Sequence, residues 1–188
     1  MNKDGRILAT AISAFVSLTL CGVAAAQSNA ARAPSDAARN LMMKASQSNL
    51  AEIEEGRLAM TNSEDPQVQA LGNRLVQDHS KAEDTLEALA ATMNVKLPSK
   101  PDSLQQQEIG KLSSLKGAAF DDVFDKGEVS SHEKTIAELQ QSAANVHNAA
   151  LKAWIEQNVP VLEQHLQLAR SLPTASSGRT PPRRRRCR

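Results

Sequence analysis

Cysteine and aromatic residues are scarce in this chain of 188 residues, which has two cysteines, one tryptophan, three phenylalanines and no tyrosine. Cys21 and Cys187 both lie near the ends of the chain, so no internal disulfide stabilises the central part and packing must do so. The low aromatic content, together with abundant Ala, Leu, Gln, Glu and Lys, favours close-packed helices over a β-sheet.

Sequence motifs of several enzyme classes are also missing. The chain has no Cys-x-x-Cys pair, no glycine-rich phosphate loop and no Ser/His/Asp arrangement. Nothing in it therefore indicates thiol redox chemistry, nucleotide binding or hydrolysis by an activated serine. The balance favours a protein that is not an enzyme.

The first 26 residues have the pattern of a signal peptide. Lys3 and Arg6 form a basic start, residues 7–23 are largely apolar, and three alanines at 24–26 provide a cleavage site before Gln27. The apolar run is short for a lasting transmembrane helix, and no later segment is apolar enough to span a membrane. We expect export to the periplasm or beyond, followed by a flexible linker over 27–35.

Charge is distributed unevenly along the chain. Residues 27–178 contain 14 basic and 20 acidic side chains, whereas residues 179–188 contain six arginines and no acid. Residues 173–188 are a Ser/Gly/Pro/Arg segment that cannot bury apolar area, so we expect a disordered tail. Export and the lack of interleaved aromatics argue against nucleic acid as a partner. The tail would instead contact anionic envelope lipids weakly, or be an unselected terminus.

Residues 36–172 are expected to form one all-α domain, a four-helix bundle with an extra short helix in a long crossover. A first helix is predicted over 36–61, a second from Pro66, a short one over 103–115, a third long one over 118–146 and a fourth over 148–172. The second shows the clearest seam, with apolar or small residues and one histidine alternating at steps of four and three. Pro160 would kink the fourth helix, unless a new helix starts there with Asn158 as its cap.

Three histidines lie in three different predicted helices, and a glutamate is similarly placed on the remaining one. His79, His132 and His165, with Glu52, would project into the bundle from its four helices, which is how a bundle builds an interior site. Three imidazoles and a carboxylate suit a single transition ion such as zinc, copper, nickel or mononuclear iron. The alternative is that neutral histidines are hydrogen-bonded to the glutamates and bind no metal. His147 lies in a predicted loop and has no expected role.

Further carboxylates lie near these histidines in the sequence. Glu83 follows His79 by four residues, and Glu128 precedes His132 by four, so both are additional candidate ligands. The Glu-x-x-His spacing of di-iron bundles is absent, since Val76, Val129 and Leu162 stand three residues before the histidines. Asp121, Asp125 and Glu128 form an acidic row that we interpret as a solvated helix edge, with a path for cations as the alternative.

Four ordered segments resemble the DUF4142 family, exported bacterial proteins of the ferritin-like superfamily. The segments are EIEEGRLA at 52–59, QDHSKA at 77–82, GAAFD at 117–121 leading to SHEK at 131–134, and VPVLEQHL at 159–166. The resemblance implies a ferritin-like four-helix bundle with a long crossover between the second and third long helices. It also implies that Glu52, His79, His132 and His165 are the family's polar positions. Glu55 departs from the family pattern, which more often has an apolar residue there, and it could add a ligand or merely face solvent.

The sequence leaves three functions open. The leading hypothesis is an exported metal-binding or stress-related protein without a catalytic cycle. A second is an envelope structural or interaction bundle in which a vestigial His/Glu core only sets the helix register. A third is a metal-dependent oxidase or peroxide scavenger.

Overall fold

The computed structural model describes residues 34–173. The predicted signal peptide and nearly all of the predicted linker and tail lie outside these residues. Within them the chain forms α-helices and no strand. The helices are α1 (Asp36–Asn62), α2 (Pro66–Thr92), α3 (Ser103–Ser113), α4 (Gly117–Ala143) and α5 (Ala149–Ser171).

Polar side chains cap four of these five helices near the predicted positions. The Ser35 side chain accepts a hydrogen bond from the Ala38 amide at 3.2 Å, and Asp65 accepts one from Gln67 at 2.8 Å, just before the proline of the first turn. Asp102 forms a capping box with Gln105, and Asn148 caps α5. Each side chain satisfies an amide that the first helical turn leaves without a partner, so these starts could be predicted locally.

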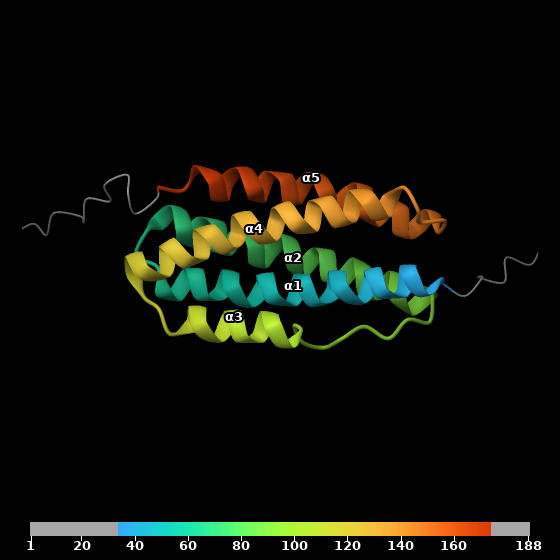
Figure 1. The fold of residues 1–188 in the computed structure, drawn as a ribbon, viewed down its shortest axis with the longest axis horizontal. Helices are drawn as coiled ribbons and strands as arrows, with labels where there is room; N and C mark the ends of the chain where they lie inside the picture. Colours follow the sequence, from blue (N-terminus) through green and yellow to red (C-terminus); the bar gives the residue numbers. More distant parts are fainter. Residues whose placement is uncertain (1–33, 174–188) are drawn as a thin grey trace, which may run out of the picture. The chain divides into compact units, whose positions relative to one another are not determined.

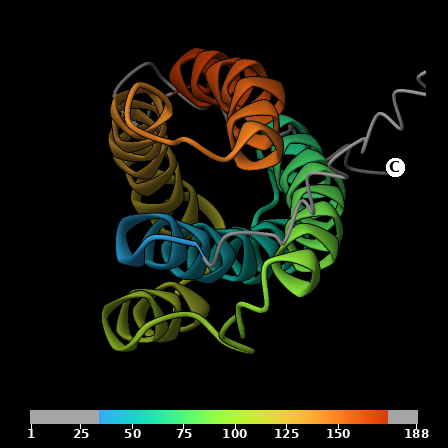
Figure 2. The ribbon, with the colours of Figure 1, turned by 90° about the vertical axis from the view of Figure 1, so that its right-hand side faces the viewer.

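The four long helices form two antiparallel hairpins (Figure 1). α1 pairs with α2, and α4 pairs with α5. A crossover that contains α3 runs back along the bundle, so α4 runs parallel to α2 (Figure 1). Seen along the bundle, the four long helices surround a common interior, and α3 lies outside α1 (Figure 2). This is the predicted topology of a ferritin-like bundle with one long crossover.

The fourth long helix is continuous through its proline. α5 runs from Ala149 to Ser171 with Pro160 inside it, so the alternative of a new helix starting at this point is wrong. The Asn158 amide does not cap a new helix. It donates instead to the Trp154 carbonyl at 2.7 Å, one turn earlier in the same helix.

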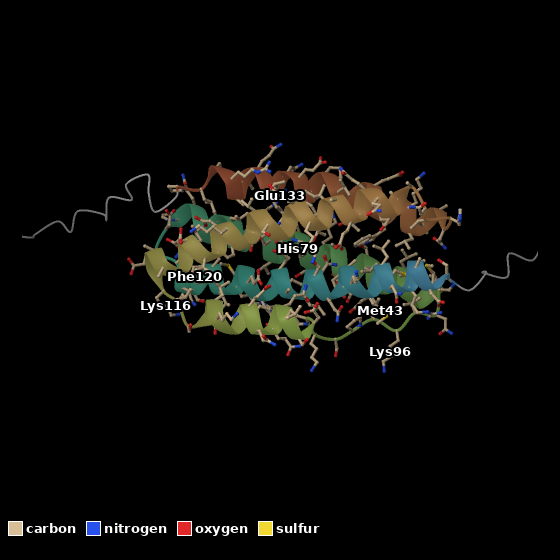
Figure 3. The ribbon with its side chains drawn as sticks, viewed as in Figure 1. Met43, His79, Lys96, Lys116, Phe120 and Glu133 are labelled. Atoms are coloured by element: carbon tan, nitrogen blue, oxygen red, sulfur yellow. The ribbon has the colours of Figure 1, made fainter. Side chains whose placement is uncertain are left out.

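Two apolar clusters fill the bundle, one towards each end. The first packs around Met42, Leu86, Leu151 and Ile155. The second packs around Leu75, Phe120 and Phe124. The segments of the four helices between these clusters carry buried polar side chains, namely Ser46, Asn49, Glu52, His79, Glu83, Asp125, Glu128, His132 and His165. The core is therefore divided by a polar layer, and Figure 3 shows His79 about midway along the bundle.

α1 and α2 approach each other closely at a pair of glycines. A Cβ atom built on Gly56 would lie 2.6 Å from the Gly72 carbonyl oxygen, and one on Gly72 would lie 2.6 Å from the Gly56 carbonyl oxygen. Such contacts are well inside van der Waals distance, and the opposing atoms are backbone. This crossing therefore requires residues without side chains at both positions.

Replacing Gly56 with alanine is expected to destabilise the bundle. Either helix must move to relieve the clash, and overpacking of this kind costs about 1–3 kcal/mol. The matched control is Gly127→Ala in α4, where an added Cβ meets nothing within 4 Å. That variant should gain about 0.5–1 kcal/mol from better helix propensity. Chemical denaturation of both variants measures the difference, and equal stability would show that the helices do not approach as described.

None of the helices within residues 34–173 has an apolar stretch that could cross a bilayer.

Candidate metal centre

Three histidines meet inside the polar layer, each from a different helix. His79 comes from α2, His132 from α4 and His165 from α5, and their side chains are at most 4% exposed. The ring centroids lie 5.3 to 5.9 Å apart. One nitrogen from each ring lies within 4.8 Å of the others. The structure thus brings together the three histidines that the sequence singled out, and we call them the histidine triad.

One nitrogen of His79 faces a hydrogen-bond acceptor outside the triad. Its Nδ1 lies 3.1 Å from the Asn49 side-chain oxygen. The Asn49 amide nitrogen donates to Glu83 at 2.9 Å, which fixes the orientation of the amide. His79 Nδ1 must therefore carry the hydrogen, and its Nε2 carries a lone pair.

The other two histidines are held in the same way. His132 Nδ1 lies 2.9 Å from the backbone carbonyl of Glu128, and His165 Nε2 lies 2.9 Å from the Asp78 carboxylate. Both partners are acceptors, so both ring nitrogens are donors. Burial would raise the pKa of Asp78, but hydrogen bonds from Arg74 and His165 outweigh it and hold that pKa below its usual range.

The remaining ring nitrogens face one another without a hydrogen between them. His132 Nε2 and His165 Nδ1 are 3.3 Å apart, and both are lone-pair nitrogens once the outward bonds are counted. His79 Nε2 is buried and has no hydrogen-bond partner among residues 34–173. With their outward nitrogens as donors, the three imidazoles direct their other nitrogens at a common place. A metal ion, a water molecule or an extra proton at this place would complete the arrangement.

Burial keeps the triad from taking up that extra proton easily. It lowers the pKa of His79 to about 4, and the neighbouring rings His132 and His165 add to this against the attraction of Glu52. Burial also lowers the pKa of His165, although the hydrogen bond to Asp78 opposes it. At neutral pH these two rings are uncharged and are available as ligands.

A second buried group lies on the opposite edge of the His132 ring. It consists of Glu52, Glu128 and His132. His132 Nδ1 lies 3.4 Å from a Glu128 carboxylate oxygen and 3.9 Å from one of Glu52. Ser131 donates to Glu52 at 2.9 Å. We call Glu52 and Glu128 the carboxyl pair.

The two members of the carboxyl pair differ in charge. Burial raises the pKa of Glu128 well above its usual value, and the charges of Glu52 and Glu55 raise it further. Burial would also raise the pKa of Glu52, but attraction to the His132 and His79 rings when these are protonated, together with hydrogen bonds from Glu128 and Ser131, holds that pKa below its usual value. At neutral pH a protonated Glu128 therefore lies beside an ionised Glu52. This explains how two carboxyl groups share one buried site.

The structure divides the predicted ligand set. Glu52 belongs to the carboxyl pair and not to the triad. Glu83 accepts hydrogen bonds from Ser46 and Asn49, and so supports His79 indirectly. Glu55 is half-buried in a groove beside α3, where burial, with the charges of Glu52 and Glu108, raises its pKa to about 8.

The acidic row of α4 is not a solvated edge, and that interpretation was wrong. Asp121, Asp125 and Glu128 are 2%, 8% and 1% exposed. Their spacings of four and three place them on the same helix face as His132, and that face points inwards. The sequence could not show this because Phe120 and Phe124 also repeat every four residues, one position earlier, and suggested an apolar face instead.

Two residues that hold the triad had no predicted role. Asn49 lies three residues before Glu52, so its place on the same face of α1 was a usable signal. Asp78 directly precedes His79 in the sequence but pairs with His165, 87 residues away. Only the packing of α2 against α5 reveals that contact.

The sequence profile described as "Domain of unknown function (DUF4142)" matches residues 23–172, which are most of the chain. The chain belongs to this family. No curated protein and no solved structure is significantly similar to it. The DUF4142 match confirms the predicted family, and it assigns no activity.

The lowered pKa of His79 predicts a pH-dependent stability in the metal-free DUF4142 bundle. As the pH falls below 6.5, the unfolded chain binds a proton at this ring before the folded one does, so stability is lost between pH 6.5 and about 4. The shift corresponds to at most about 3 kcal/mol. Denaturation in the presence of a chelator should show a smaller loss over this range for His79→Gln than for the parent.

The control for this measurement is His147→Gln. His147 is exposed near the start of α5 and touches neither the triad nor the carboxyl pair. This variant should keep the parental pH dependence. Identical slopes for the parent and His79→Gln would contradict the buried, neutral state of the ring.

Proposed function

We propose that this protein binds one transition-metal ion between α2, α4 and α5. The ligands are His79 Nε2, His132 Nε2 and His165 Nδ1. The observation that carries the proposal is the convergence of three buried lone pairs with no hydrogen to share. A bundle that needed these histidines only for packing would gain nothing from leaving all three without a donor.

The surroundings of the triad fit a metal ligand set. Histidines that bind metals donate their second ring nitrogen to a carboxylate, a carbonyl or water, which fixes the ring orientation. Asn49, the Glu128 carbonyl and Asp78 accept such bonds here. The residues that would orient the ligands are therefore already in place.

The donor set indicates the class of ion. Neutral imidazoles favour zinc, copper, nickel or mononuclear iron, and three of them leave a further coordination position for water or a small ligand. A cavity of about 20 Å³ adjoins His79 and His165. A space of this size holds one water molecule. The site suits binding of an ion more than conversion of a large substrate.

The carboxyl pair argues against a second metal beside the first. His132 Nδ1 is the ring nitrogen that faces this pair, and it already donates to the Glu128 backbone carbonyl at 2.9 Å, so a cation there would find only the two carboxyl groups as ligands. This favours a single-ion binding protein over a di-metal oxidase. With the N-terminal segment taken as a signal peptide, we propose that the protein binds its metal outside the cytoplasm, in the periplasm or beyond.

Elemental analysis tests the proposal. The full chain is to be expressed without a polyhistidine tag and purified after export, in parallel with a His79→Ala/His165→Ala double variant and the exposed control His147→Ala. We expect close to one ion per chain in the parent and in the control. We expect at least a tenfold lower content in the double variant.

If the parent contains no metal, even after incubation with zinc, copper and ferrous iron, the proposal fails. The histidines would then be polar core residues, and the bundle would be a structural or interaction protein.

Asp78 should affect metal affinity without binding the metal. Asp78→Ala removes the acceptor of the His165 Nε2 hydrogen, and loss of such a partner typically weakens metal binding about 10–100-fold. Asp78→Asn keeps a neutral oxygen that can accept the same hydrogen, so its loss should be smaller. Competition with a chelator of known affinity measures both variants. Equal affinities in the parent and Asp78→Ala would exclude this role.

A further inference from the structure

A long groove runs along the bundle between α1 and α4. It has a volume of about 640 Å³ and is lined by α1, α3 and α4 together with the start of the turn into α3. α3 lies outside α1 and forms one wall of the groove (Figure 2). Leu104 and Val123 are 67% and 47% exposed on its sides. The crossover therefore leaves part of the bundle interior close to solvent.

The groove reaches the small cavity beside the triad. Four residues line both spaces, namely Ala45, Ser48, Thr135 and Leu139. Ala45 and Leu139 are buried, while Ser48 and Thr135 are half-buried. On the far side of these four residues, the cavity is bounded by His79 and His165. One layer of side chains thus separates the groove from two of the three ligands.

We propose that this groove is the access route of the metal ion, and that the ion passes between Ser48 of α1 and Thr135 of α4. The inference rests on the proposed function of the triad. Both side chains are small and end in a hydroxyl oxygen, which can replace one water of the ion during passage. Their partial exposure shows that they form the thin part of the wall.

The charge of the groove supports this route. Besides Glu55, which is mostly protonated at neutral pH because its pKa is raised to about 8, its lining contains four acidic side chains, Glu52, Asp102, Glu108 and Glu138, against two lysines, Lys44 and Lys134. Glu52 Oε2 is buried and has no hydrogen-bond partner among the described residues, although the side chain belongs to this lining. A cleft lined by charges of one sign concentrates ions of the opposite sign. The groove would therefore attract cations and not anionic ligands.

The protein contains its own probe of the cavity. Trp154 is the single tryptophan of the chain, and it lines the cavity together with His79 and His165. Cobalt(II) or copper(II) bound at the triad would quench its fluorescence. Stopped-flow mixing of the full-length, metal-free protein with cobalt(II) then gives the association rate, and displacement by a chelator gives the dissociation rate.

Ser48→Leu should close the route. We expect at least a tenfold slower association and an equally slower dissociation, so that the dissociation constant and the stoichiometry stay the same. The matched control is Ser80→Leu. Ser80 is also half-buried and adjoins His79 in the sequence, but it lines neither the groove nor the cavity. The control should keep the parental rates.

Thr135→Ala tests the same wall from the side of α4. Its expected effect on the rates is opposite to that of Ser48→Leu. Removing its hydroxyl and methyl groups should widen the passage and speed both rates several-fold. If circular dichroism shows that Ser48→Leu does not fold, Thr135→Ala alone tests whether the ion passes through this wall. Unchanged rates in Thr135→Ala and in a folded Ser48→Leu, with one ion still bound, would overturn the route but leave the metal site intact. Failure of the parent itself to bind cobalt(II) would instead refute the proposed function.

Discussion

The structure depends on how a layer of buried polar groups is satisfied in the middle of an apolar bundle. Each histidine of the triad directs one N–H outwards, to an amide oxygen, a backbone carbonyl or a carboxylate. The second nitrogens then face inwards as acceptors. Burying a ring nitrogen without a hydrogen-bond partner costs more free energy than most single contacts contribute. We therefore expect these nitrogens to interact with a group bound at the centre of the layer. A bound cation at that point would satisfy all three nitrogens together.

This layer also explains the arrangement of the apolar core. The core is split into two clusters, one around Leu86 and Leu151 and one around Leu75 and Phe120. Each end of the bundle is thus held by ordinary packing, and the close crossing of Gly56 and Gly72 brings α1 against α2. The rigid ends position the side chains between them. A metal site in a bundle needs such support because its ligands come from separate helices.

The crossover has a second consequence besides setting the topology. Because α3 lies against α1 and makes little contact with α4, the side of the bundle between α1 and α4 is open as a groove. Glu52 of the carboxyl pair lines this groove, and the carboxyl pair and His165 lie at opposite edges of the His132 ring. The two groups offer different ligands: the carboxyl pair offers carboxyl oxygens, and the histidine triad offers imidazole nitrogens.

The sequence by itself determined the helices, their starts and the family. Caps and apolar spacing are local properties, so Ser35, Asp65, Asp102 and Asn148 could be interpreted without knowing the fold. The three histidines were also predictable as inward-facing, since a 3.6-residue period assigns a face to each residue. Only the tertiary structure decided which groups meet. It placed Glu52 and Glu128 together, buried the row that includes Asp121, and paired Asp78 with His165. These contacts depend on how each helix is rotated about its axis and shifted along it relative to its neighbours. Helical periodicity carries no information about either.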